Sequence, residues 1–524
     1  MTEHPVRFEI ERDIAVLTID NPPVNALGHA VREALADGLS QVEANADIRA
    51  AVILGAGRTF IAGADIKEFG KPTQPPSLPE VIAQLDAMHT PVIAALHGTA
   101  LGGGLEVALG CHFRIALKAT KVGLPEVKLG ILPGAGGTQR LPRLAGAKRA
   151  LDMMTTGNFV GADEARVLGI IDDIAQGDDV RAAGLSFARH VIDTNQPVKR
   201  VRDLPAPIND PDLYASYREK LEVSARGLFS PFRIVDCVEA AANLPFDEGL
   251  AAERTHFQAC MDSPQRSGLI HAFFAERAAT KNDDIPKDTP VRRLETAAAL
   301  GTSQAAADLI RAMEKAGIEP GDGGSADIVI CADPAQSADA ADGAKPGALL
   351  ISLGMPPGAQ ASGRAEDWLG LILPDDPACR LAEIACGPKA AADTRATGAA
   401  LAKRLGLIGL PVRAGDHGVV ARLALAYQRF GEALQAQGYD AADIDGTCVQ
   451  FGMARGPCGG TMASAGQTDS AITDRLLHDL GREGERILSD GQVQRPLDID
   501  IAALHTLGFP AYRGGPMFAV GMRG

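Results

Sequence analysis

The sequence has 524 residues, of which 46% are hydrophobic and 22% charged, a composition typical of a globular protein with several domains. Asp and Glu (66) outnumber Lys and Arg (51), and the net charge of -15 disfavours nucleic acid as a partner because polyanions repel each other. The N-terminal 20 residues lack the basic start and apolar core of a signal peptide, and no apolar run reaches the roughly 18–20 residues that cross a bilayer. The eight cysteines form no CxxC pair. We therefore expect a cytoplasmic protein that binds neither nucleic acid nor membrane and holds no structural metal.

The first 120 residues alternate between predicted strands and predicted helices. Apolar residues alternate with polar ones in the first strands and recur at helical spacing in the helices. The predicted elements are, in order, a hairpin over 6–10 and 14–17, a helix over 30–42, a strand over 51–55, a helix over 79–88, a strand over 91–96 and a helix near Leu105. This order favours an α/β layered fold, and from about residue 140 the pattern becomes helical.

The second half of the chain begins with a polar, loosely patterned stretch over 285–300, and 281–284 before it predicts a hinge. Apolar segments at 327–331 and 348–351 predict short strands, whereas the Gly-, Ala- and Asp-rich segment 332–347 between them predicts a loop. From about Asp416 the pattern is helical again. We therefore expect a domain boundary near residue 284.

Three glycine-containing segments lie next to apolar strands: FIAGADIKEF (60–69), GGGLE (102–106) and GLPEV (123–127). Glycines between a strand and a helix let backbone N–H groups face a ligand, and the start of a helix adds partial positive charge. The N–H group of Gly103 is therefore a candidate oxyanion donor, and that of Ala62 is a candidate second donor. Each such donor stabilises an enolate-like thioester oxygen by about 2.7–4 kcal/mol.

Two glutamates, Glu106 and Glu126, are the candidate acid and base of this region. Held on either side of one water molecule, they would supply general base and general acid, provided that the fold brings them together. The alternative for each is a solvated surface carboxylate, and Glu126 has Lys121 and Lys128 near it in the sequence as ion-pair partners. Spacing alone leaves both interpretations open.

Four segments together resemble the crotonase (enoyl-CoA hydratase/isomerase) superfamily: NPPVNAL (21–27), FIAGADIKEF (60–69), ALGGGLEVALGCHFRIA (100–116) and VGLPEVKLGILPGAGGTQRLPRL (122–144). Residues 269–277 are similar to the linker helix of the multifunctional β-oxidation enzymes of this superfamily, and 508–518 to their last helical segment. The resemblance implies an α/β protein with a crotonase-fold (ββα spiral) domain, linker helices, a truncated Rossmann-like domain and an all-α dehydrogenase-like domain. The expected ranges are 1–190, 191–284, 285–412 and 413–524.

The resemblance also assigns roles to residues. It implies that Glu106 activates water for attack at Cβ of the substrate and that Glu126 delivers a proton to Cα. The N–H groups of Ala62 and Gly103 fall on the oxyanion donors of the family. The expected contacts with coenzyme A are Ala62, Gly63, Ala64, Asp65 and Ile66.

The dehydrogenase half departs from the family pattern. The best match to the G-x-G-x-x-G turn, over 299–304, keeps one of three glycines, and no room remains before the strand at 327 for a second βα unit with its acidic ribose ligand. Ile372 stands where the family has its catalytic His, so Glu383 has no base to orient, and Ala421 replaces an expected Asn. His417 fits a loop residue better than a substitute base. We therefore expect that NAD binding and dehydrogenase activity are lost.

The sequence thus predicts a hydratase of trans-2-enoyl-CoA that forms 3-hydroxyacyl-CoA, with an inactive dehydrogenase half and no cofactor besides the coenzyme A thioester of its substrate. Two alternatives stay open: a Δ3,Δ2-enoyl-CoA isomerase, and a noncatalytic acyl-CoA-binding scaffold. The resemblance to multifunctional enzymes leads us to expect a monomer. The Ala- and Gly-rich composition and the last residues, which do not form a peroxisomal tripeptide, favour a bacterial cytoplasmic protein.

Overall fold

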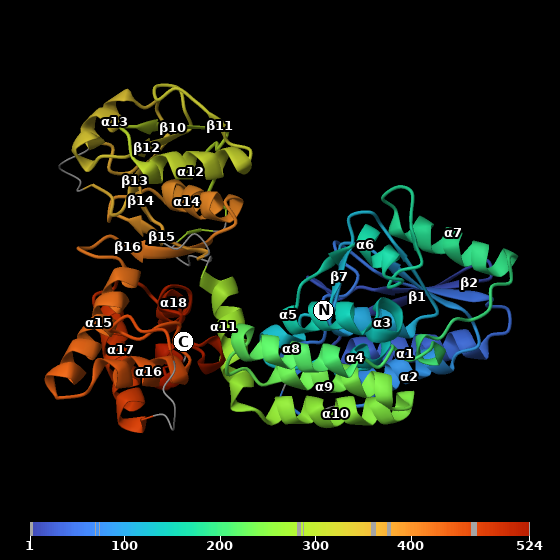
Figure 1. The fold of residues 1–524 in the computed structure, drawn as a ribbon. Coiled ribbons are helices and arrows are strands. Elements are labelled where there is room, and N and C mark those ends of the chain that lie inside the picture. The colour runs from blue at the N-terminus through green and yellow to red at the C-terminus, as the bar shows by residue number, and fades with distance from the viewer. Residues whose placement is uncertain are drawn as a thin grey trace. The chain divides into compact units, whose positions relative to one another are not determined.

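The computed structural model describes residues 4–68, 70–72, 74–279, 285–286, 288–357, 363–374, 379–462 and 469–522. The chain divides into two compact units, 1–266 and 267–524, which are described in turn (Figure 1). The hinge expected at 281–284 and the last residue of the 60–69 motif lie outside the described residues. The expected division into four domains stays a prediction. None of the described helices has the length and apolarity that a membrane span requires.

The first unit is built, in its described part, on a six-stranded sheet with the order β1-β2-β3-β4-β6-β9. The predicted hairpin is confirmed as the antiparallel pair β1–β2, and the other neighbours are parallel. The strands are β1 (Val6–Glu11), β2 (Ile14–Ile19), β3 (Ala50–Gly55), β4 (Val92–Leu96), β6 (Phe113–Ala116) and β9 (Asp173–Ile174).

Both faces of this sheet are covered, which explains why β2, β3 and β4 are almost continuously apolar. Alternate residues such as Val16 and Val52 pack beneath α7 (Val180–Asp193). Their neighbours Leu17 and Ile53 point to the opposite face, where α1 (His29–Ala44), α2 (Leu78–Ala87) and α3 (Gly103–Gly110) lie (Figure 1). These helices confirm the predictions made for 30–42, 79–88 and the segment near Leu105.

A small second sheet positions the two candidate glutamates. Its strands are β5 (Thr99–Leu101), β7 (Lys121–Gly123) and β8 (Val160–Gly161), with β5 and β7 parallel. The remaining elements of the unit are η1 (Ile66–Glu68), η2 (Glu126–Leu129), α4 (Gly137–Ala145), α5 (Ala147–Thr156), α6 (Ala162–Val167), η3 (Val201–Asp203), α8 (Pro211–Ser224), α9 (Ser230–Asn243) and α10 (Phe246–Asp262). Helix α11 (Pro264–Ala279) contains the point of division.

The second unit contains a seven-stranded sheet among its described residues, with the order β11-β10-β12-β13-β14-β15-β16. All neighbours are parallel except β14 and β15. The strands are β10 (Thr296–Leu300), β11 (Glu319–Pro320), β12 (Ile328–Cys331), β13 (Leu349–Leu353), β14 (Trp368–Ile372), β15 (Leu381–Cys386) and β16 (Ile408–Arg413), and the helices are α12 (Gln304–Lys315), η4 (Pro334–Gln336), α13 (Ser337–Gly343) and α14 (Ala392–Arg404). The strands expected at 327–331 and 348–351 are confirmed.

The prediction of a loop over 332–347 is wrong, because η4 and α13 lie within this segment. The Asp333 side chain caps η4 by accepting a hydrogen bond from the N–H of Ala335. Ala340 and Ala341 of α13 are buried against the sheet beside Leu350. Burial of these small side chains stabilises a helix that the composition alone disfavours, since Gly, Asp and Pro are typical of loops.

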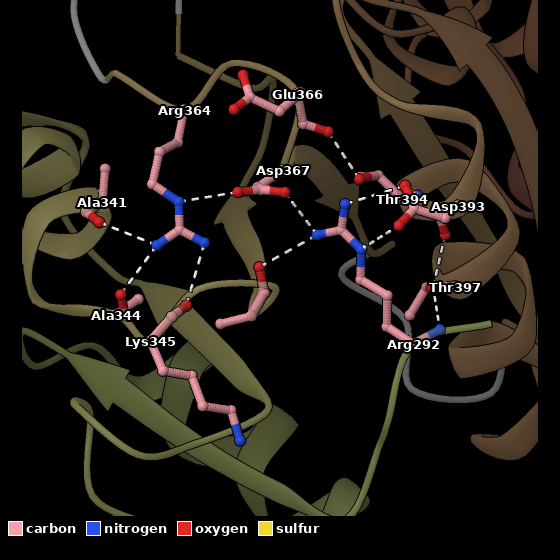
Figure 2. Close-up of polar contacts among 11 residues, drawn as sticks. Arg292, Ala341, Ala344, Lys345, Arg364, Glu366, Asp367, Asp393, Thr394 and Thr397 are labelled. Carbon is pink, nitrogen blue, oxygen red and sulfur yellow. Dashed lines mark hydrogen bonds and ion pairs between the residues drawn. The ribbon is translucent and has the colours of Figure 1, made fainter. Parts of the chain in front are cut away.

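A network of ion pairs lies along the amino-terminal edge of the second sheet and links the segments that meet there (Figure 2). Arg292 precedes β10 and pairs with Asp367 (2.7 Å), which precedes β14, and with Asp393 (2.9 Å) at the start of α14. Arg364 pairs with the same Asp367 (2.8 Å) and donates to the carbonyl groups of 341, 344 and 345. Because parallel strands share their amino-terminal edge, the network ties this edge together and leaves the carboxyl edge, where nucleotides bind in open α/β sheets, outside it.

The helical remainder of the second unit packs on β15 and β16. Buried residues that include Leu410 of β16, Leu423 and Leu480 form its core. The elements are α15 (Val419–Ala436), α16 (Ala441–Phe451), α17 (Ser470–Ser489), α18 (Pro496–Ala502), η5 (Ala503–Leu507), η6 (Ala511–Arg513) and α19 (Pro516–Ala519). The predicted fold class, an α/β protein with a helical C-terminal part, is confirmed.

Candidate active site

The strands β5 and β7 bring the two candidate glutamates into one region. Leu101 at the end of β5 lies opposite Gly123 at the end of β7, and the N–H of Gly102 donates to the carbonyl of Gly123 (2.9 Å). Glu106 follows β5 in the first turn of α3, and Glu126 follows β7 at the start of η2. Tertiary pairing of the two strands therefore supplies the proximity that sequence spacing left open.

Glu106 is buried, with 3% of its surface exposed. Its Oε1 accepts hydrogen bonds from the N–H groups of Ala135 (2.8 Å) and Gly137 (2.9 Å), at the start of α4. Burial raises the pKa of this carboxyl, whereas the two N–H donors and the charge of Arg140 act in the opposite direction. Because Oε1 holds both donors, Oε2 is the oxygen that can take a proton from a reactant.

Glu126 presents a buried carboxyl oxygen, Oε2, that has no hydrogen-bond partner among the described residues. Its Oε1 lies 3.0 Å from the point where a Cβ on Gly102 would stand, and Gly102 has φ +53°, so glycine is required there. Burial, and next the charge of Glu106, raise the pKa of Glu126 well above its usual range. The alternative of a surface ion pair is not realised, since Lys128 Nζ lies instead over the ring of Phe159 (5.6 Å).

The oxyanion prediction is wrong at Ala62. The N–H of Ala62 donates to the carbonyl of Val24 (3.1 Å) and is therefore not available to a substrate. Gly103 is the first residue of α3, and its N–H has no acceptor within the helix. The nitrogen of Ala64 lies 3.4 Å from the point where a Cβ on Gly103 would stand, and its N–H has no acceptor among the described residues. Ala64, and not Ala62, is thus the structural partner of Gly103.

Backbone pairing explains this two-residue error. Residue 61 forms a bridge with Ala100 and residue 64 with Leu27, whose N–H donates to the carbonyl of Gly63 (2.9 Å). Along such a segment the direction of the N–H groups depends on which neighbouring strand each residue pairs with, and the sequence does not state the pairing. Asp65 uses its Oδ1 locally, to accept from the N–H of Lys67 (3.0 Å). The coenzyme A contacts expected over 62–66 stay predictions.

A third buried glutamate, Glu253 of α10, was missed in the sequence. It is 2% exposed and accepts hydrogen bonds from the N–H of Gly136 (2.7 Å) and from the N–H (3.0 Å) and hydroxyl (2.5 Å) of Thr138. Burial, and next the charge of Glu106, raise the pKa of Glu253 to about 8. The one available signal was its position on the buried face of α10, four residues after Gly249 and seven before Cys260.

The glycine-rich turn of the second unit begins two residues later than predicted. Strand β10 continues to Leu300, so the first glycine of the turn is Gly301, with φ +84°. Ser303 then occupies the second glycine position and caps α12 by accepting from the N–H of Ala306 (3.1 Å). After α12 the chain forms the two-residue strand β11, and no helix lies between β11 and β12 in the described residues.

Glu383 of β15 lies opposite Ile372 of β14 and is 1% exposed. Its Oε1 accepts from the N–H of Val420 (2.6 Å), and its Oε2 is buried without a hydrogen-bond partner among the described residues. Burial raises the pKa of Glu383 to about 7. His417 lies in the loop between β16 and α15, exposed to solvent, as the sequence indicated.

Comparisons with known proteins match both parts of the chain. The family model described as enoyl-CoA hydratase/isomerase matches residues 9–207. The peroxisomal bifunctional enzyme of Danio rerio is 28% identical, over 99% of this chain and 92% of that enzyme. That alignment is 671 positions long, more than the 524 residues of this chain, so the fish enzyme holds segments that this chain lacks.

Matches at higher identity cover less of the chain. A probable enoyl-CoA hydratase of Bacillus subtilis is 45% identical, over 32% of this chain and 67% of that protein. The human peroxisomal bifunctional enzyme is 42% identical, and the chain spans 37% of its length in that match, which covers 51% of the chain. A solved enoyl-CoA hydratase structure from Bacillus anthracis is 26% identical, covers 52% of this chain and 96% of its own, and has a TM-score of 0.35.

Proposed function

The chain belongs to the enoyl-CoA hydratase/isomerase family, and we propose that it adds water reversibly to trans-2-enoyl-CoA to give 3-hydroxyacyl-CoA. One observation carries the proposal: the paired strands β5 and β7 place Glu106 and Glu126 in one region, and the buried Oε2 of Glu126 has no hydrogen-bond partner among the described residues. A structural carboxylate in a protein interior is normally fully hydrogen-bonded, so a buried carboxyl oxygen without a partner, beside a second glutamate that is itself buried, favours a chemical role.

The first step of the proposed reaction places the thioester carbonyl oxygen between the N–H groups of Gly103 and Ala64. As water attacks Cβ, Glu106 Oε2 takes one of the water protons, and the electron pair of the double bond moves toward the thioester to form an enolate. The two N–H groups stabilise the negative charge that develops on the oxygen, and the start of α3 adds its partial positive charge. Glu106 Oε1, held by two backbone donors, keeps the carboxylate oriented during the transfer.

The second step delivers a proton from Glu126 to Cα of the enolate. Burial, and next the charge of Glu106, raise the pKa of Glu126 and so favour its protonated form, as a proton donor requires. Glu106 holds two N–H donors and faces Arg140, which favour its ionised form, although burial opposes ionisation. Two carboxyl groups whose surroundings differ in this way are suited to separate roles as base and acid.

Isomerisation of Δ3- to Δ2-enoyl-CoA is a second candidate activity. It requires one group that moves a proton between Cα and Cγ and needs no activated water. The partner-free Oε2 of Glu126 favours this as an accompanying activity, because an oxygen that no protein group occupies can exchange a proton with the substrate at either carbon.

We further propose that the second unit neither binds NAD nor oxidises the 3-hydroxyacyl product. Ser303 uses its hydroxyl on the N-terminus of α12, where a pyrophosphate would accept hydrogen bonds. Gln336 Oε1 lies 2.7 Å from the point where a Cβ on Gly301 would stand, and so occupies the space beside the turn. Ile372 cannot exchange a proton with a hydroxyl group. No helix follows β11 before β12 in the described residues, so the second βα unit of a dinucleotide-binding fold is incomplete.

A two-stage absorbance assay in a single cuvette tests these proposals. Crotonyl-CoA is added to the full-length protein and the absorbance of the conjugated thioester is followed, after which NAD is added and NADH absorbance is recorded. We expect loss of the enoyl signal and no NADH. Binding of crotonyl-CoA without turnover would replace the proposal by a noncatalytic scaffold, and formation of NADH would contradict the assignment of the second unit. Glu126→Gln, which removes the proposed proton donor to Cα, is the inactive control for the crotonyl-CoA measurement.

A further inference from the structure

The loop before α4 gives its N–H groups alternately to two carboxylates. The groups of 135 and 137 donate to Glu106 Oε1, at 2.8 and 2.9 Å. Those of 136 and 138 donate to Glu253, at 2.7 and 3.0 Å. The first N–H groups of a helix have no partner inside the helix, so these four hydrogen bonds are the ones that orient the loop 135–138. Glu106 and Glu253 thus hold opposite sides of the same stretch of backbone.

Glu253 is firmly seated in this arrangement. The amide of Gln139 donates to the hydroxyl oxygen of Thr138 (3.0 Å), so the hydroxyl hydrogen is directed to Glu253. Helix α10 packs close to α4, because a Cβ on Gly249 would stand 2.2 Å from Gln139 Oε1. The ring of Phe257, one turn after Glu253 along α10, lies 2.4 Å from the point where a Cβ on Gly134 would stand. The loop is therefore held by α10 on one side and by Glu106 on the other.

We propose that Glu253 is a positioning residue for Glu106: it holds the N–H groups of 136 and 138 so that those of 135 and 137 stay aimed at Glu106 Oε1. The inference rests on the proposed hydratase function, in which Glu106 acts as the base. Adjacent peptide planes are linked through shared Cα atoms, so a plane that loses its acceptor rotates and turns its neighbours with it. Glu106 Oε1 would then lose its donors, and the carboxylate would leave the orientation needed to take a proton from water.

The variant Glu253→Gln separates positioning from catalysis. A glutamine amide has one acceptor oxygen, so its NH2 group would face either the N–H of Gly136 or that of Thr138, donor against donor. Since a small misplacement of a catalytic group is costly, we expect kcat for crotonyl-CoA to fall ~10–100-fold while KM changes less than ~2-fold. Glu248→Gln makes the same substitution on the exposed side of the same helix and should leave kcat and KM unchanged.

Two further variants keep the test informative if Glu253→Gln yields no folded protein. Thr138→Val removes the hydroxyl donor but keeps the N–H group of 138 and the carboxylate, and should lower kcat less than Glu253→Gln does. Glu253→Asp keeps the carboxylate at a shorter reach and should recover part of the activity. A fall of kcat in Thr138→Val with unchanged KM, and partial recovery in Glu253→Asp, would both support positioning.

The outcomes distinguish this inference from the hydratase proposal. If the unaltered protein turns over crotonyl-CoA and the Glu253 and Thr138 variants match it in kcat, the positioning role is wrong and hydration stands. A rise in KM with unchanged kcat would also overturn it, since that result places the effect in substrate binding. A folded, unaltered protein that turns over no enoyl-CoA would remove the hydratase function, and the role of Glu253 with it.

Discussion

Replacing Glu383 by glutamine should make the second unit more stable above neutral pH. The carboxyl is 1% exposed, and one of its two oxygens has a hydrogen-bond partner, the N–H of Val420 (2.6 Å), among the described residues. Burial raises its pKa from 4.5 to about 7. Between these two pH values the folded protein retains a proton that the unfolded chain has released. The free energy of unfolding therefore falls as the pH rises through this window.

The size of the effect follows from the two pKa values. A tenfold change in an equilibrium constant is about 1.4 kcal/mol, so the difference between 4.5 and about 7 corresponds to about 3 kcal/mol of stability that is present at low pH and lost above neutrality. Glutamine stays neutral at every pH, and its carbonyl oxygen can still accept from Val420. We expect the variant to match the wild-type stability near pH 4.5 and to exceed it by up to about 3 kcal/mol near pH 8.

Trp368 makes this measurable within the full chain. It is the single tryptophan of the sequence, it is 2% exposed, and it lies on β14, the strand paired with that of Glu383. Urea unfolding followed by its fluorescence at acidic and alkaline pH gives the stability of this sheet. The exposed Glu485→Gln of α17 is the control for loss of one charge. If Glu383→Gln shows the same pH dependence as the wild type, or is less stable at both pH values, the reasoning about this buried carboxyl is refuted.

Three further predictions concern the active site and the ion network. Glu106→Gln should lower the rate of crotonyl-CoA hydration about 10²–10⁴-fold but spare Δ3-enoyl-CoA isomerisation, because the glutamine oxygen can still accept from the N–H groups of 135 and 137 while the base is lost. An equal loss of both activities would contradict the assignment of Glu106 to hydration alone. Gly103→Ala would bring a methyl group 2.8 Å from Leu78 Cδ2 and 3.4 Å from the nitrogen of Ala64, the other proposed oxyanion donor. We therefore expect kcat/KM for crotonyl-CoA to fall ~10²-fold. Gly161→Ala, a site with open space around it, is the control and should not change kcat/KM. Arg292→Met should lower the free energy of unfolding by about 1.5–3 kcal/mol, because Asp393 loses its ion-pair partner while Asp367 keeps Arg364. The change would be seen as a lower urea midpoint of Trp368 fluorescence. Arg293→Met, on an exposed side chain, should shift that midpoint little.

Local patterns in the sequence determined most of the secondary structure. The alternation around the turn at 11–13 predicts the β1–β2 hairpin, and the apolar runs at 51–55 and 91–96 predict strands because a sheet covered on both faces needs apolar residues at every position. Segment 332–347 was misjudged since its helix depends on burial of alanines that the pattern does not indicate. Residue types made Glu106, Glu126 and Gly103 candidates, and the resemblance to the crotonase superfamily implied their roles, which residue spacing had left open.

Only the tertiary structure decided how these residues meet. Glu106 and Glu126 lie in one region because β5 pairs with β7, and a strand pairing is a long-range property that twenty residues of spacing do not specify. The choice of Ala64 over Ala62 depends on whether an N–H group is already occupied, here by Val24, which lies about forty residues earlier in the chain. Glu253 is more than a hundred residues from the loop it holds. A hydrogen bond is set by direction and distance in space, so the residues that chemistry requires are visible in the sequence, but the partners that orient them are not.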